Sequence, residues 1–258
     1  MSYDDILYDT RDGVATITIN RPDKLNAFSG HTIEEMIEAA DQESGERSTR
    51  AKHYFEEFRK ANDLAEVQSG PGPDGVSIWW REEIGREDQL VALRGRRTDI
   101  VVVGRPAEAM DQSAFMTLHA AIFETARPVL LTPSEKPATI GRNIAIAWNG
   151  TAQSSRAIKS AMPLLPAAQD IVLLQGSGAG EVPVELLLEY LAAYDLSASV
   201  QGYDSQRLTA RARGRALIAA ATEAGANLLV TGAFGEGQPG VLSGLGRATR
   251  KIVTAAPI

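Results

Sequence analysis

The second half of the chain alternates apolar runs of strand length with amphipathic runs of helix length. Four apolar runs are predicted strands, at 143–148, 170–174, 199–202 and 226–232. The runs between them repeat apolar positions at helical spacing and are predicted helices. Such alternation favours right-handed crossovers between parallel strands, with helices on both faces of the sheet. The pattern therefore predicts a doubly wound α/β domain.

Each predicted helix carries one apolar stripe and a recognisable end. The helix that follows Gly150 and Thr151 has a shared face of Ile158, Ala161, Met162 and Leu165. In 181–195, Pro183 suits a first helical turn, and the stripe consists of Leu187, Tyr190, Leu191 and Tyr194. The helix at about 206–223 ends before Gly225, where a left-handed cap is easiest, and a last helix is expected at 245–254.

The middle of the chain repeats the end of this pattern. A strand at 98–104 ends at Gly104, and the strand at 226–232 ends at Gly232, 128 residues later. A period of this length indicates a duplicated domain. Further elements of the first copy are predicted as a strand at 76–82, helices at 86–97 and 114–126, and a strand at 127–133. The domains are therefore expected at 47–132 and 143–258, joined by a proline-containing linker at 133–142.

Composition narrows the function. The 258 residues are 44% hydrophobic and 23% charged, with a net charge of -7, which disfavours nucleic acid or an anionic membrane as a partner. The arginines of 207–215 are interpreted as a solvated helix face. The absence of cysteine excludes thiolate catalysis and sulfur-ligated zinc, and the three histidines show no metal spacing, so no metal site is predicted. The acidic N-terminus and the lack of a long apolar run predict a cytoplasmic protein.

Residues from about 50 to 258 resemble a tandem universal stress protein. The resemblance rests on IAWNGTAQSSRAI, EVPVELLLEYL and LLVTGAFGEG with GRATRKIVTAAPI. It implies two Rossmann-like domains of the adenine nucleotide alpha hydrolase type and a role in stress response. It also implies ATP or AMP as ligand in the second domain, with weak ATP hydrolysis at most and no catalytic residue identified. The two domains are expected to pair about a pseudo-twofold axis, or the chain to form a homodimer.

The resemblance also implies which residues hold the nucleotide. They lie at the ends of the first and fourth strands of the second copy: Ala147, Asn149, Gly150, Thr151, Gly232, Gly235, Gly246 and Arg247. Gly232 and Gly235 keep the family spacing, whereas Gly246 comes one residue late and Arg247 replaces a small residue. Asn149 stands where the family has aspartate. A glycine-rich loop kept only for a tight strand-to-helix turn is the alternative interpretation.

The first residues resemble a different family. Residues 3–42, including ITINRPDKLNAFSG, are similar to the N-terminus of the crotonase (enoyl-CoA hydratase/isomerase) superfamily. Strands are predicted at 6–8 and 14–19 around an Asp12-Gly13 turn, followed by a helix with a capping box of Thr32 and Glu35. This resemblance implies an alternative function, an acyl-CoA hydratase or hydrolase.

The rest of the chain lacks the crotonase chemistry. That chemistry needs two backbone amides that stabilise a thioester enolate, and the sequence after Gln42 contains neither of the turns that supply them. A charged helix is predicted there instead. Two origins of residues 1–46 remain open: a fusion in which 14–20 supplies the missing first strand of the first domain, with the following helix, or a joining of segments from two genes.

Overall fold

The computed structural model divides the chain into two compact units, Met1–Ile84 and Gly85–Ile258. Each unit is described separately. The described residues are 3–11, 14–68, 72–73, 75–105, 112–133, 135, 137–177, 182–233, 252–253 and 256. Within them, no helix combines the length and the apolar character that crossing a membrane requires.

The first unit begins with a β-hairpin. Strands β1 (Ile6–Arg11) and β2 (Val14–Ile19) pair antiparallel, with Ile6 opposite Ile19, which confirms the two predicted strands. The Asp12-Gly13 turn lies outside the described residues. A short 3-10 helix, η1 (Pro22–Lys24), follows, and the side chain of Asn26 accepts a hydrogen bond from the Arg21 amide at 2.8 Å.

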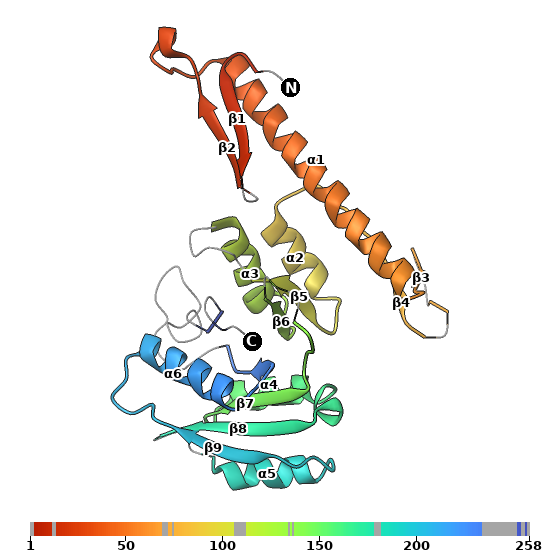
Figure 1. Cartoon of the computed structure of the whole chain (residues 1–258), viewed down its shortest axis with the longest axis vertical. Coiled ribbons are helices and arrows are strands. Elements are labelled where there is room, and N and C mark those ends of the chain that lie inside the picture. Colours follow the sequence, from red (N-terminus) through yellow and green to blue (C-terminus); the bar gives the residue numbers. More distant parts are fainter. Residues whose placement is uncertain are drawn as a thin grey trace. The chain divides into compact units, whose positions relative to one another are not determined.

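A 32-residue helix, α1 (Gly30–Ala61), follows, and its first turns lie beside the hairpin (Figure 1). Ser29 caps it, because the Ser29 hydroxyl accepts from the Thr32 amide at 3.1 Å and the Thr32 hydroxyl accepts from the Ser29 amide at 3.2 Å. The expected capping box of Thr32 and Glu35 is therefore wrong. The helix begins one turn earlier, and Glu35 turns toward the start of the hairpin instead. The charged helix expected after Gln42 is confirmed as the second half of α1.

The first unit ends in two short strands, β3 (Ala65–Glu66) and β4 (Ser77–Ile78), which pair in parallel. The strand expected at 76–82 is therefore reduced to two residues. Among the described strands, β2 pairs with β1 alone.

The second unit opens with two helices and two strands. Helix α2 (Glu87–Gly95), strand β5 (Val101–Gly104), helix α3 (Gln112–Glu124) and strand β6 (Val129–Thr132) lie close to the predicted positions. The two strands pair in parallel, with Val101 opposite Val129. Gly95 lies against Thr125 so closely that a β-carbon there would come within 2.5 Å of the threonine methyl group, which explains the glycine at the end of α2.

The remainder of the second unit is built on a four-stranded parallel sheet (Figure 1). Its strands, in spatial order, are β10 (Leu228–Val230), β7 (Asn143–Trp148), β8 (Asp170–Gly176) and β9 (Ser199–Tyr203). Ile144 lies opposite both Leu228 and Ile171. All four predicted strands are present, and the chain has a mixed α/β structure with parallel sheets.

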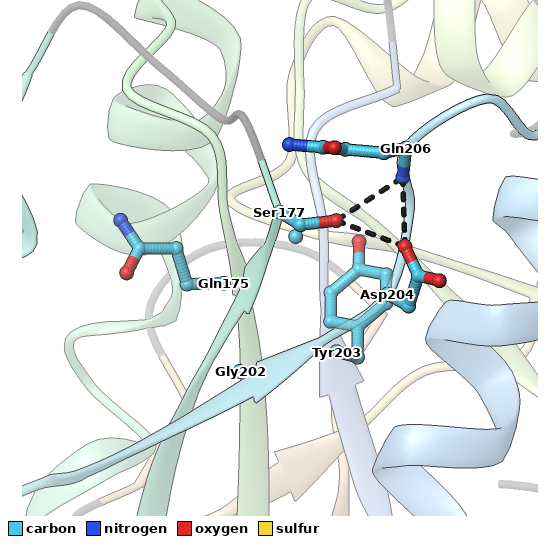
Figure 2. A pocket seen from close by; sticks show the side chains of 7 residues that line it. Gln175, Ser177, Gly202, Tyr203, Asp204 and Gln206 are labelled. Carbon is cyan, nitrogen blue, oxygen red and sulfur yellow. Dashed lines mark hydrogen bonds between the residues drawn. The ribbon is translucent and has the colours of Figure 1, made fainter.

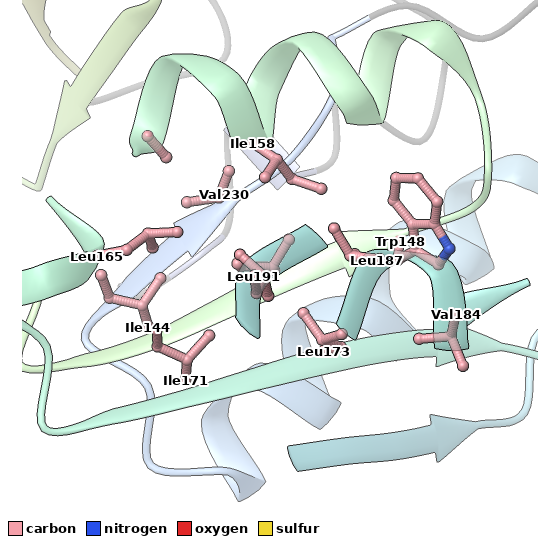
Figure 3. Packing of buried hydrophobic residues seen from close by; sticks show 12 residues of the cluster. Ile144, Trp148, Ile158, Leu165, Ile171, Leu173, Val184, Leu187, Leu191 and Val230 are labelled. Atoms are coloured by element: carbon pink, nitrogen blue, oxygen red, sulfur yellow. The ribbon is translucent and has the colours of Figure 1, made fainter. Parts of the chain in front are cut away.

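Helices cover both faces of this sheet. Alternate residues of β7 point to opposite faces, as strand geometry requires. One face packs against α4 (Ala152–Ala161) and α5 (Val184–Ala192), and Figure 3 shows Ile158, Leu187 and Leu191 among strand residues such as Leu173. The other face packs against α6 (Ala210–Glu223), where Ala145 and Leu174 meet Leu217. A 3-10 turn, η2 (Leu165–Ala167), adds the fully buried Leu165 to the first of these cores.

In the second unit, the start of α6 and the apolar stripe of α5 differ from the sequence expectation. Helix α6 begins at Ala210 rather than near Gln206, because Thr209 caps it and Arg207 adopts a positive φ of 57°. Its expected end is confirmed, since Gly225 has a φ of 67°. On α5, Leu187 and Leu191 are buried as predicted, whereas Tyr190 is 37% exposed. Tyr194 lies in the turn after the helix and is 50% exposed, and the centroids of the two tyrosine rings are 5.2 Å apart.

Candidate functional site

The carboxyl ends of β7 and β10 lie side by side, and described residues that follow the two strands pack on opposite faces of the sheet. Ile146 of β7 is opposite Val230 of β10. The chain after β7 enters α4 on one face of the sheet, whereas Ile252, beyond β10, packs on the opposite face with the core under α6. In open parallel sheets, ligands bind at the strand ends where neighbouring connections diverge in this way. This point of the sheet is the candidate site.

The turn after β7 is ordered by its own side chains. The Asn149 side-chain oxygen accepts from the Thr151 hydroxyl at 2.7 Å and from the Thr151 amide at 3.3 Å. Gly150 has a φ of 71°, a conformation that favours glycine. Thr151 then caps α4 by accepting from the Ser154 amide at 3.4 Å. The Asn149 side-chain nitrogen has no hydrogen-bond partner among the described residues, so it is available to a ligand.

Gly232, just after β10, lies against the first turn of α4. A β-carbon on Gly232 would be 3.0 Å from the Gln153 carbonyl carbon and 3.1 Å from the Ser154 amide nitrogen. These distances are tighter than ordinary van der Waals contact, so a side chain at this position would require the first turn of α4 to shift by a few tenths of an ångström. The structure thus brings Gly232 within one helical turn of Thr151. The close approach also gives Gly232 a packing role that does not require a ligand.

The end of α4 at this point carries positive partial charge. The first amides of a helix have no acceptor within the helix, and the aligned peptide dipoles favour an anion at the N-terminus. In α4 these are the amides that follow Thr151, including those of Ala152 and Gln153. Gly232 packs beside them. A phosphate group near this turn would meet backbone donors and no opposing carboxylate among the described residues of the turn.

Not every predicted site residue belongs to this arrangement. Ala147 packs with the core under α6, which indicates a structural role for its side chain. Gly235, Gly246 and Arg247 lie outside the described residues. Asn149, Gly150, Thr151 and Gly232 are the predicted residues that the structure brings together.

A pocket of about 640 Å³, which the sequence did not predict, lies at the carboxyl ends of β8 and β9 (Figure 2). Its lining is mainly polar: Gln175, Gly176, Ser177, Gly202, Tyr203, Asp204 and Gln206. The Asp204 carboxylate accepts from the Ser177 hydroxyl at 3.1 Å and from the Gln206 amide at 3.0 Å (Figure 2). Burial raises the pKa of the Tyr203 phenol. Polar residues directly after two predicted strands were the signal that could have located this pocket.

The chain matches no model of a known protein family, and no solved structure matches it significantly.

Proposed function

We propose that the chain is a universal stress protein-like module that binds an adenine nucleotide, ATP or AMP, in its second domain. The proposal includes a fold assignment: two tandem Rossmann-like domains of the adenine nucleotide alpha hydrolase type. One observation carries the proposal: Gly232 packs on the first turn of α4, beside the turn of Asn149 and Thr151, where the connections of a parallel sheet diverge.

Different groups of the site suit different parts of the nucleotide. Backbone amides after Thr151 and around Gly232 suit the phosphates, because they are donors at the positive end of α4. The Asn149 side-chain nitrogen suits an acceptor on the base or the ribose. Gly235, Gly246 and Arg247 complete the phosphate loop in this proposal, and Arg247 adds the positive charge that the turn itself lacks.

We propose little or no catalysis at this site. In the described part of it, Asn149, Thr151, Gln153 and Ser154 supply amide and hydroxyl groups, whose ordinary pKa values do not suit a general base near neutral pH. Weak ATP hydrolysis is the most that we expect. A role in stress response, a location in the cytoplasm, and pairing of two domains or two chains are parts of the same proposal.

The acyl-CoA alternative gains no support from the first unit. A crotonase needs a strand and a turn after its first helix, where a backbone amide stabilises the thioester enolate. In this chain, α1 continues unbroken to Ala61. The hairpin β1–β2 and the start of α1 therefore resemble that family without supplying this part of its site.

Replacement of Asn149 with alanine is expected to weaken nucleotide binding about tenfold, because the ligand loses one hydrogen bond and the turn loses its side-chain acceptor. The measurement is a titration of the full chain with a fluorescent ATP analogue. Asn143→Ala is the matched control, since Asn143 lies at the opposite end of the same strand and contacts Gly225. It should change the affinity by less than about twofold.

Two results would contradict the proposal. One is the absence of saturable binding by the unmodified chain at millimolar nucleotide. The other is an equal loss of affinity in the Asn149 and Asn143 variants, which would show that the effect arises from general destabilisation of β7.

A further inference from the structure

Three potential metal ligands converge in the first unit, whereas the proposed nucleotide site belongs to the second unit. Asp4 precedes β1, while His31 and Glu35 lie one turn apart near the start of α1. One ligand atom from each lies within 4.8 Å of the other two. The spacing of residues along the chain does not reveal this set, because Asp4 belongs to a different element and comes 27 residues before His31.

Glu35 is fixed in place before any ligand binds. Its side chain is buried, and its two oxygens accept hydrogen bonds from the Asp4 amide at 2.7 Å and the Asp5 amide at 2.8 Å. A carboxylate has about four acceptor positions, so each oxygen keeps capacity for one further partner. Metal ligands are commonly oriented by hydrogen bonds from groups that do not bind the metal themselves, and these two backbone amides orient Glu35 in that way.

The distances between the ligand atoms suit a shared ion better than direct hydrogen bonds. His31 Nε2 is 3.3 Å from Glu35 Oε1 and 3.9 Å from Asp4 Oδ2. A charge-assisted hydrogen bond between such groups would be about 2.7–2.9 Å. Two ligands each about 2.0–2.1 Å from a tetrahedral zinc ion are roughly 3.3–3.4 Å apart, and wider angles give longer separations. The His31–Glu35 separation matches that of two ligands on one tetrahedral ion, whereas the exposed Asp4 carboxylate would have to move about 0.5 Å closer to His31.

The surrounding charge is negative. Glu34 Oε2 lies 3.9 Å from His31 Nδ1, on the other side of the ring. Asp5 adds another carboxylate, and the Arg21 guanidinium pairs with it at 3.0 Å. Four carboxylates thus surround His31 with one guanidinium among them. A cation is favoured at this position although the N-terminus of α1 opposes it.

We propose that Asp4, His31 and Glu35 form a binding site for a divalent transition-metal ion such as Zn²⁺. One imidazole nitrogen and two carboxylate oxygens are a ligand set that zinc accepts, whereas an all-oxygen set would suit Mg²⁺ or Ca²⁺. The side chains of His31 and Asp4 are 56% and 89% exposed, so the remaining coordination positions are open to water. Zinc would tie the residues before β1 to α1. This inference is independent of the nucleotide proposal.

The test is calorimetric titration of the untagged full chain with zinc chloride. The unmodified chain should bind one equivalent at the site. His31→Ala and Asp4→Asn should each weaken this binding at least about tenfold, because each removes one of three ligands. His53→Ala is the matched control: His53 Nε2 is also 3.3 Å from the carboxylate of a residue four positions later, Glu57, but no third donor joins this pair among the described residues. It should leave the affinity within about twofold.

Circular dichroism checks that the helix content of each variant is unchanged, and Asp4→Asn serves as the second variant because its side chain is almost fully exposed. The proposal is overturned if the unmodified chain binds no zinc, or if His53→Ala weakens binding as much as His31→Ala. It is also overturned if Asp4→Asn binds zinc as tightly as the unmodified chain, which would reduce the site to an ordinary helical pair of His31 and Glu35.

Discussion

Replacing Leu173 with alanine is expected to lower the free energy of unfolding of the Gly85–Ile258 unit by about 2–5 kcal/mol. Leu173 is fully buried in β8, in the core that α4 and α5 form with the sheet. Its truncation removes apolar contacts and leaves a cavity that neighbours such as Leu187 and Ile144 fill only in part.

The measurement uses urea denaturation followed by the fluorescence of Trp148, which lies in the same core. Trp79 and Trp80 belong to the first unit, so both are changed to phenylalanine in the starting protein. Leu186→Ala is the control, because Leu186 is 52% exposed on α5, and its effect should stay within about 0.5 kcal/mol. Equal effects of the two leucine changes would show that this core is not packed as described.

Gly232→Ala is the second large effect that we expect. The new β-carbon would meet the backbone of Gln153 at 3.0 Å and of Ser154 at 3.1 Å, and backbone cannot move aside as easily as the end of a side chain. Overpacking of this kind costs about 1–3 kcal/mol of stability. It should also weaken nucleotide binding, because relief of the contact moves the end of β10 away from the first turn of α4.

Gly104→Ala is the matched control for this change. Gly104 ends β5 at the position equivalent to Gly232 in the 128-residue repeat, yet nothing lies within 4 Å of a β-carbon placed there. Stability from urea denaturation and affinity from nucleotide titration are measured for both variants. If Gly232→Ala is as stable and binds as tightly as Gly104→Ala, then the packing of β10 on α4 does not position the site.

The sequence predicted the second half of the fold well because each element there has a strong local signal. Apolar runs specify β7 and β8, and Gly225 ends α6 as predicted. One error concerns aromatic residues. Tyr190 and Tyr194 match the helical stripe of α5, but each has a polar hydroxyl and the two rings contact each other instead of the core. Aromatic residues satisfy an apolar pattern whether they are buried or half-exposed.

The start of α1 shows the same limit. Thr32 followed by Glu35 fits a capping box, yet Ser29 is also a suitable capping residue. Sequence alone does not show which of these residues lies beside the start of β1. Because the amides of Asp4 and Asp5 reach Glu35, its carboxylate is used between elements rather than within the helix. These two hydrogen bonds join residues that are 31 and 30 positions apart in sequence, so no local pattern predicts them.

The candidate site was predictable only in its local parts. The turn of Asn149, Gly150 and Thr151 follows from adjacent residues, and each does what its type favours there. The packing of Gly232 on Gln153 depends on strand order, which places β10 next to β7. The pocket at β8 and β9 likewise requires the parallel pairing of these two strands. Their polar ends are far apart in sequence, so neither end alone predicts a pocket.

The measurement that tests the nucleotide proposal most directly is amide hydrogen exchange of the full chain with and without saturating ATP. The proposal predicts slower exchange at residues 149–154 and 231–233, where the donors of the turn, of α4 and of the end of β10 would bind the nucleotide. Exchange at the pocket residues Ser177 and Gln206 should not change. Unchanged exchange throughout, or protection confined to that pocket, would contradict binding at the ends of β7 and β10.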